Sequence, residues 1–88
     1  MSLRIAVLVS GRGSNLQVML DAVADGTLAA DIVGVFSDKP QAPALQRVPE
    51  SLRWSADPRA FPDRESFDQQ LADAISATNP DWVICAGY

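Results

Sequence analysis

Apolar residues follow two alternating patterns along this chain. Short apolar runs, the first of them rich in β-branched residues, are typical of buried strands. They lie at residues 4–10, 32–37, 52–55 and 82–86. Between them, apolar residues recur at helical spacing, as at Leu16, Met19, Leu20 and Val23. Strands that alternate with helices predict an α/β fold with a parallel, right-handed, Rossmann-like sheet and flanking helices.

Turn residues set the expected ends of the two main helices. The first helix is predicted over residues 15–25, with Gly26 as its left-handed cap. Asp63 is the expected N-cap of a helix that runs to about Thr78. The inner face of that helix is formed by Phe67, Leu71, Ala74 and Ile75. The prolines between residues 38 and 49 leave room only for a short helical piece near residues 44–48, in a loop over the sheet.

The segment after the first strand, residues 10–17, reads Ser-Gly-Arg-Gly-Ser-Asn-Leu-Gln. Ser14 and Gln17 fit a variant of the capping box that opens a helix. A strand, a glycine bend and a helix start bring backbone N–H groups and the positive end of the helix dipole to one point, which favours a phosphate. Such bends also occur without a ligand, but Ser14 and Asn15 add side-chain donors.

Two better-known phosphate motifs do not fit this segment. Leu16 stands where the dinucleotide fingerprint has its third glycine, and no lysine completes a P-loop. The sequence therefore predicts a phosphate site of another type at residues 11–15, called the glycine turn below.

Composition and charge exclude several classes of protein. The chain has 88 residues, enough for one small domain, and its net charge is −4 without a basic cluster, which argues against nucleic acid as a partner. The single Cys85 excludes an internal disulfide and is expected to be a packed small residue in the fourth strand. No apolar run approaches ~20 residues, so no membrane partner is expected and the cytoplasm is favoured. Asp81 is assigned to a turn, and no cluster of metal ligands is evident.

Four motifs in order resemble those of folate-dependent phosphoribosylglycinamide formyltransferases. They are Val-Ser-Gly-Arg-Gly-Ser-Asn-Leu-Gln at 9–17, Val-Phe-Ser-Asp-Lys at 35–39, Arg-Glu-Ser-Phe-Asp at 64–68 and Pro-Asp-Trp-Val-Ile-Cys-Ala-Gly-Tyr at 80–88. The resemblance spans the whole chain. It implies transfer of a formyl group from 10-formyltetrahydrofolate, as co-substrate, to the amine of 5-phosphoribosylglycinamide in purine biosynthesis, with small-molecule substrates and no metal.

The resemblance also assigns site residues. Gly13, Ser14 and Asn15 match the positions that hold the substrate phosphate, and Arg64 matches a position that contacts the formylfolate. Without the resemblance, an arginine at a helix start would be taken for a solvated surface charge. Asp38 stands where the family usually has Asn, which replaces a donor by a carboxylate near the ligand edge.

The chemistry of formyl transfer needs a proton shuttle and a donor for the developing oxyanion. The family provides these with an Asn, a His and an Asp, but this sequence contains no histidine. The catalytic motif would lie beyond Tyr88, so no catalytic residue is assigned in this chain. We expect residues 1–88 to form the amino-terminal, substrate-phosphate-binding part of a formyltransferase domain, inactive by itself.

Several interpretations stay open at this level. Arg12 either adds charge at the phosphate or points to water, and Trp54 and Trp82 are expected to pack in the core. A formyltetrahydrofolate hydrolase or an initiator-tRNA formyltransferase is an alternative that the glycine turn disfavours, because a phosphoribosyl amine is the substrate that needs a phosphate site there. A non-catalytic phosphate- or nucleotide-binding module, or a structural domain, would need no catalytic motif.

The fourth strand is expected to expose apolar surface or an unpaired edge, which favours self-association.

Overall fold

The computed structural model describes residues 3–88 and contains one four-stranded parallel sheet with strand order β3-β2-β1-β4. The strands are β1 (Leu3–Val9), β2 (Ala30–Ser37), β3 (Arg53–Ser55) and β4 (Trp82–Cys85). The helices are α1 (Ser14–Ala24) and α2 (Arg64–Ala77), with three 3₁₀ turns, η1 (Pro43–Arg47), η2 (Glu50–Leu52) and η3 (Pro58–Ala60). The predicted Rossmann-like fold is confirmed, and the ends of the main helices and strands differ from prediction by only about one or two residues.

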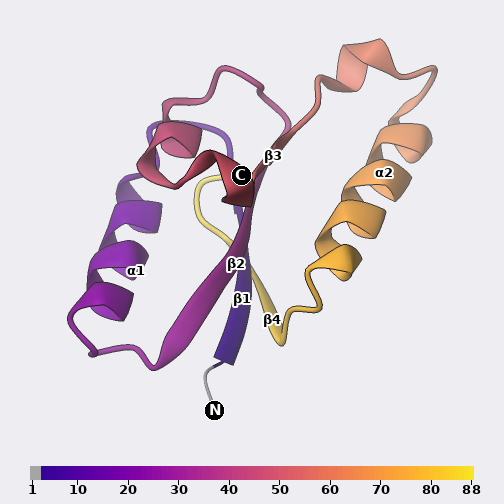
Figure 1. Ribbon diagram of the computed structural model, residues 1–88. Coiled ribbons are helices and arrows are strands. Elements are labelled where there is room, and N and C mark those ends of the chain that lie inside the picture. Colours follow the sequence, from indigo (N-terminus) through magenta and orange to yellow (C-terminus); the bar gives the residue numbers. More distant parts are fainter. Residues whose placement is uncertain (1–2) are drawn as a thin grey trace.

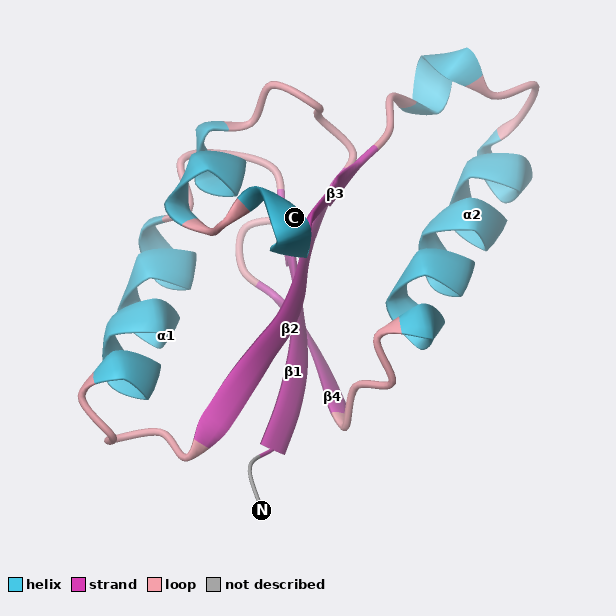
Figure 2. Ribbon diagram, in the orientation of Figure 1, coloured by secondary structure: helices cyan, strands magenta, loops and turns pink. Residues whose placement is uncertain are grey.

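Helices cover both faces of the sheet (Figure 1; Figure 2). Residues that alternate along each strand point to opposite faces, so Val7 and Val35 pack on the side of α1, whereas Leu8 and Phe36 pack on the side of α2. The core on the α1 face is mostly aliphatic and also includes the buried residues of η1. The core on the α2 face is built around Phe67, which is fully buried.

The helix ends confirm two predicted caps and correct one. Gly26 has φ +83°, the left-handed conformation expected just past the end of α1. Asp63 caps α2, because its carboxylate accepts a 2.7 Å hydrogen bond from the backbone N–H of Ser66. The capping box of Ser14 and Gln17 is wrong: the N-cap of α1 is Gly13, which has no side chain to offer.

The fourth strand lies at the edge of the sheet and exposes apolar side chains, as predicted. Trp82 is 60% exposed and Val83 is 48% exposed. Two packing predictions are therefore wrong, since Trp82 is not in the core and Cys85 is exposed. The spacing of apolar residues alone could not show that Trp82 and Cys85 are exposed, because a strand of apolar residues is buried only where another element covers it. Trp54 does pack in the core, 6.1 Å from Phe36 between ring centroids.

The proline-rich segment after β2 forms η1 and η2 and packs against the α1 face of the sheet. Ala44 and Leu45 of η1 are buried. The predicted loop over the sheet is confirmed, and the short helical piece expected near residues 44–48 is the 3₁₀ turn η1. Across residues 3–88, no helix has the length and apolar character that a membrane crossing requires.

Candidate functional site

Three segments predicted to share the carboxyl edge of the sheet do meet there. Val9 pairs with Ser37 of β2, and Leu8 pairs with Cys85 of β4, so the strands end side by side. The backbone N–H of Ala86 donates to the carbonyl of Leu8 at 2.8 Å, which extends the alignment past β4. In open parallel sheets this edge is the usual place for ligands.

The conformation of the glycine turn depends on Gly13. This residue is buried at the N-cap of α1 with φ +82°, a conformation that L-residues with a Cβ rarely adopt. A Cβ built there would lie 2.6 Å from the Cβ of Ala44 in η1. Gly13 is therefore required by its backbone angle and by the close approach of η1, and only the first reason could be read from the sequence.

The 3₁₀ turn η1 holds the glycine turn in place through hydrogen bonds. The backbone N–H of Ala44 donates to the carbonyl of Gly11 at 3.0 Å, and Nε of Arg47 donates to the carbonyl of Arg12 at 2.7 Å. A second guanidinium nitrogen of Arg47 donates to the side-chain carbonyl of Gln17 at 3.1 Å. Sequence reasoning missed Arg47, because it reaches the turn from 35 residues away and belongs to no motif.

The start of α1 can accept an anion. Its first N–H groups have no intrahelical acceptor, as at every helix start, and Gly13 provides no side-chain cap. Ser14 and Asn15 are both exposed, and the first turn carries no acidic residue that would repel an anion. The structure thus brings Gly13, Ser14 and Asn15 together at the positive end of α1.

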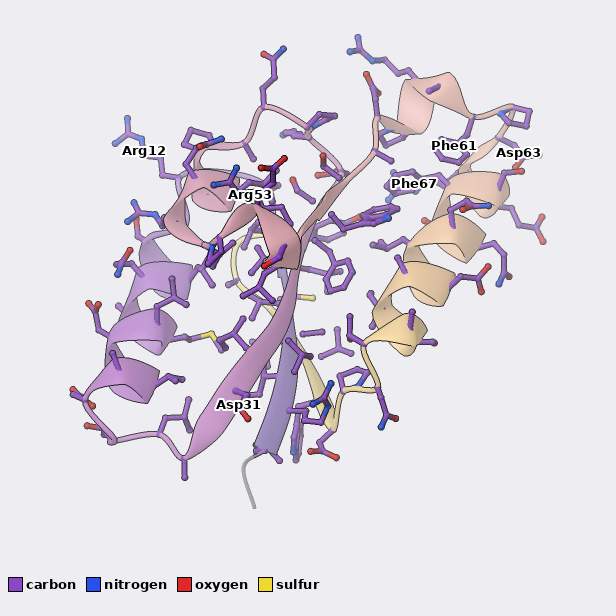
Figure 3. The ribbon with its side chains drawn as sticks, viewed as in Figure 1. Arg12, Asp31, Arg53, Phe61, Asp63 and Phe67 are labelled. Carbon is purple, nitrogen blue, oxygen red and sulfur yellow. The ribbon has the colours of Figure 1, made fainter. Side chains whose placement is uncertain are left out.

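Arg12 lies in the glycine turn with its side chain exposed. Figure 3 shows it directed away from the body of the molecule. The exposed position agrees with the interpretation in which Arg12 points to water, and the positive charge held against the turn comes from Arg47 instead.

Arg64 lies apart from the glycine turn, at the start of α2 on the opposite face of the sheet from α1 (Figure 1). Its Nε donates to the carboxylate of Asp68 at 3.0 Å, and its guanidinium carbon lies 5.0 Å from the ring centroid of Phe67. The side chain is 59% exposed, which leaves it accessible to a ligand.

Tyr88, just past β4, lies close enough to Asp38 and Arg64 for their charges to change the pKa of its phenol. Burial raises the pKa of the Tyr88 phenol above its ordinary value, and the negative charge of Asp38 raises it further, while Arg64 opposes both effects. A tyrosine is already protonated at neutral pH, so these effects leave Tyr88 a hydrogen-bond donor there.

Asp81 occupies a turn, as predicted: its carboxylate accepts a 2.9 Å hydrogen bond from the backbone N–H of Arg4. No group of three or more His, Cys, Asp or Glu side chains within residues 3–88 is arranged to hold a metal ion.

These features define an α/β protein whose candidate site lies at the carboxyl edge of a parallel sheet, and the family model described as "Formyl transferase" matches residues 3–88. The chain belongs to this family, as the four sequence motifs predicted. It is 35% identical to phosphoribosylglycinamide formyltransferase of Escherichia coli over 88 residues, which is 98% of this chain and 42% of that protein. It is 40% identical to the trifunctional purine biosynthetic protein adenosine-3 of Drosophila melanogaster, covering 97% of this chain and 7% of that protein.

Solved structures agree with the sequence relatives. Glycinamide ribonucleotide transformylase 1 of Symbiobacterium toebii superimposes with a TM-score of 0.91 at 38% identity, covering 99% of this chain and 42% of that one. The corresponding protein of Geobacillus kaustophilus gives a TM-score of 0.92 at 28% identity, covering 100% of this chain and 48% of that one. The chain thus spans less than half the length of these single-function relatives.

Proposed function

We propose that the chain supplies the substrate-phosphate-binding part of a phosphoribosylglycinamide formyltransferase. Such an enzyme transfers a formyl group from 10-formyltetrahydrofolate to the amine of 5-phosphoribosylglycinamide, a step of purine biosynthesis. The proposal is supported by membership of the formyl transferase family and by relatives that carry this enzyme's name over almost the whole chain. Its reactants are small molecules, and we place the reaction in the cytoplasm.

The observation that carries the proposal is the glycine turn. Gly13, Ser14 and Asn15 offer N–H groups and short polar side chains at the positive end of α1, where the phosphate of the substrate would lie. Arg47, held against the turn by its hydrogen bond to the carbonyl of Arg12, adds a fixed positive charge beside the phosphate.

Arg64 is the proposed contact for the folate. Its exposed guanidinium, oriented by Asp68 and by the ring of Phe67, fits an anionic or carbonyl-bearing group of a formylfolate. When bound, 10-formyltetrahydrofolate would supply the formyl group. The chain's own residues hold the two reactants at the same edge of the sheet.

Formyl transfer passes through a tetrahedral intermediate and needs a group that moves protons near neutral pH. The chain has no histidine, and its asparagines are Asn15, at the start of α1, and Asn79, in the turn that follows α2. We therefore expect the 88 residues to bind substrate phosphate without catalysing transfer.

Phosphate binding is tested by replacing Ser14 with Asp. An acidic residue in the first turn of a helix does not destabilise it, because the helix dipole favours negative charge there. The same charge repels a phosphate. In the 88-residue chain, phosphate or 5-phosphoribosylglycinamide should raise the thermal unfolding midpoint, and Ser14→Asp should abolish the rise.

The matched control is Ser51→Asp, which adds the same charge at an exposed residue of η2. It should leave the ligand-induced rise unchanged. A midpoint that does not move at high ligand concentration in the original chain would rule out the phosphate site.

The second test is an assay of formyl transfer with the 88-residue chain, using the E. coli relative as a positive control. We expect no product above the rate without protein. Turnover that scales with the concentration of the chain would show that the chemistry lies within these residues and that its assignment is wrong.

A further inference from the structure

Two successive carbonyl groups of the glycine turn are held by η1. The backbone N–H of Ala44 donates to the carbonyl of Gly11, and Nε of Arg47 donates to the carbonyl of Arg12 at 2.7 Å. These carbonyls belong to the peptide units Gly11–Arg12 and Arg12–Gly13. The contacts with η1 therefore fix the orientation of both peptide units, in addition to the place of the turn.

The orientation of a peptide unit decides where its N–H group points. A trans peptide unit is planar, so its N–H points in the direction opposite to its carbonyl. Because both carbonyls are directed at η1, the N–H groups of Arg12 and Gly13 point away from it. None of the backbone-to-backbone hydrogen bonds of residues 3–88 outside the helices and strands uses either N–H as a donor. Successive N–H groups that point to the same side form a concave site for an anion.

The guanidinium of Arg47 is itself oriented by α1. Its Nη1 donates to the side-chain carbonyl of Gln17 at 3.1 Å, and the amide nitrogen of Gln17 donates to the carboxylate of Asp21 at 2.9 Å. The stem of Arg47 also lies against the turn, since a Cβ built at Gly13 would be 3.1 Å from its Cδ. A planar guanidinium that meets two acceptors at once has a fixed orientation, which the ammonium of a lysine does not reproduce.

We propose that Arg47 is a positioning residue for phosphate binding: it holds the carbonyl of Arg12 and thereby directs the N–H of Gly13, in the same peptide unit, toward the ligand. The proposal rests on the phosphate site proposed above. It assigns Arg47 a role through the backbone, which differs from that of a positive charge beside the phosphate. A charge alone could come from a lysine, whereas positioning requires the two hydrogen bonds of the guanidinium.

Titration of the 88-residue chain and its variants with inorganic phosphate separates the two roles. Arg47→Lys keeps the charge but not the two-acceptor geometry, and it should weaken phosphate binding by about tenfold. Arg47→Met also removes the charge and should weaken binding further by no more than about fivefold, because the charge is exposed to solvent. If Arg47→Lys binds phosphate as tightly as the original chain, the positioning role is overturned while the phosphate site stands.

The amide resonance of Gly13 gives a readout that a loss of stability would not move. In the original chain, phosphate should shift the amide proton of Gly13 downfield, because this N–H then donates to an anion. In Arg47→Lys, the shift at saturating phosphate should be smaller, since the peptide unit is no longer fixed. The same shift at saturation in both proteins would overturn the proposal.

A second variant tests the support that α1 gives to Arg47. Gln17→Leu removes one of the two acceptors and should weaken phosphate binding by about threefold. Combined with Arg47→Lys it should cause no further loss, because both changes break the same chain of hydrogen bonds. Losses that simply add would contradict this chain.

The matched control is Arg53→Lys. Nε of Arg53 donates to the carbonyl of Val48 at 3.0 Å, so this arginine makes the same kind of contact outside the glycine turn. Arg53→Lys should bind phosphate like the original chain, and a loss equal to that of Arg47→Lys would overturn the positioning role. If phosphate does not bind the original chain, the glycine turn is not a phosphate site and both proposals fail.

Discussion

The two faces of the sheet are stabilised in different ways. The α1 face is covered by an amphipathic helix and by η1, which together bury a continuous aliphatic cluster. The α2 face relies on a smaller aromatic cluster, in which Phe67 contacts Phe61 edge to face at 5.5 Å between ring centroids. The glycine turn belongs to the first face and Arg64 to the second. The proposed phosphate site is therefore backed by the larger core cluster and the proposed folate contact by the smaller one.

The largest expected effect compares equivalent leucines on the two faces. Leu16 of α1 is fully buried, whereas Leu71 of α2 is 8% exposed at the border of its cluster. Leu16→Ala should lower the free energy of unfolding by about 3–5 kcal/mol and Leu71→Ala by about 2 kcal/mol. Urea unfolding followed by circular dichroism measures both. Equal losses would contradict the difference between the faces.

The contact between the glycine turn and η1 gives the next effect. Gly13→Ala should cost about 2–4 kcal/mol, because the new Cβ meets Ala44 and the backbone is left-handed. Gly11→Ala is the control, since a Cβ there meets nothing within 4 Å, and it should change stability by less than about 0.5 kcal/mol. Combining Gly13→Ala with Ala44→Gly should recover part of the loss. No recovery would mean that the strain is purely conformational.

The exposed edge predicts self-association. Trp82 and Val83 leave apolar surface on β4, whose outer edge is unpaired and open to a second copy. Sedimentation velocity should show association that increases with concentration and is abolished in the double variant Trp82→Thr with Val83→Thr. The control Val18→Thr removes an equally apolar side chain, 67% exposed on α1, and should associate like the original chain. A chain that stays monomeric at high concentration would contradict this prediction.

The smallest expected effect is the response to acid at the start of α2. Hydrogen bonds from Ser66 lower the pKa of Asp63, and those from Arg59 lower the pKa of Asp57. Both carboxylates favour the folded state while charged, so their contribution is present above pH 3.8 and is lost as the pH falls through the lowered folded-state values. Unfolding midpoints from pH 6 to pH 2.5 should fall less steeply in Asp63→Asn, which keeps a cap but cannot titrate. An identical slope would show that the cap does not contribute.

The position of the glycine turn and the α/β architecture were predictable because local physics determines them. Alternating apolar runs and helical stripes specify the order of elements, and Gly26 and Asp63 mark helix ends through backbone conformation and capping. The candidate phosphate residues follow from the same local pattern, a strand, a glycine bend and a helix start.

Only the tertiary structure decided which residues those elements meet. The contact of Ala44 with Gly13 and the hydrogen bond from Arg47 to the carbonyl of Arg12 both join segments distant in sequence. The exposure of Trp82 and Cys85 likewise depends on which strands flank β4. The physical reason is that the spacing of apolar residues shows which face of a segment can be buried. Whether that face is buried or paired depends on which other element packs against it, and this is set by the tertiary structure.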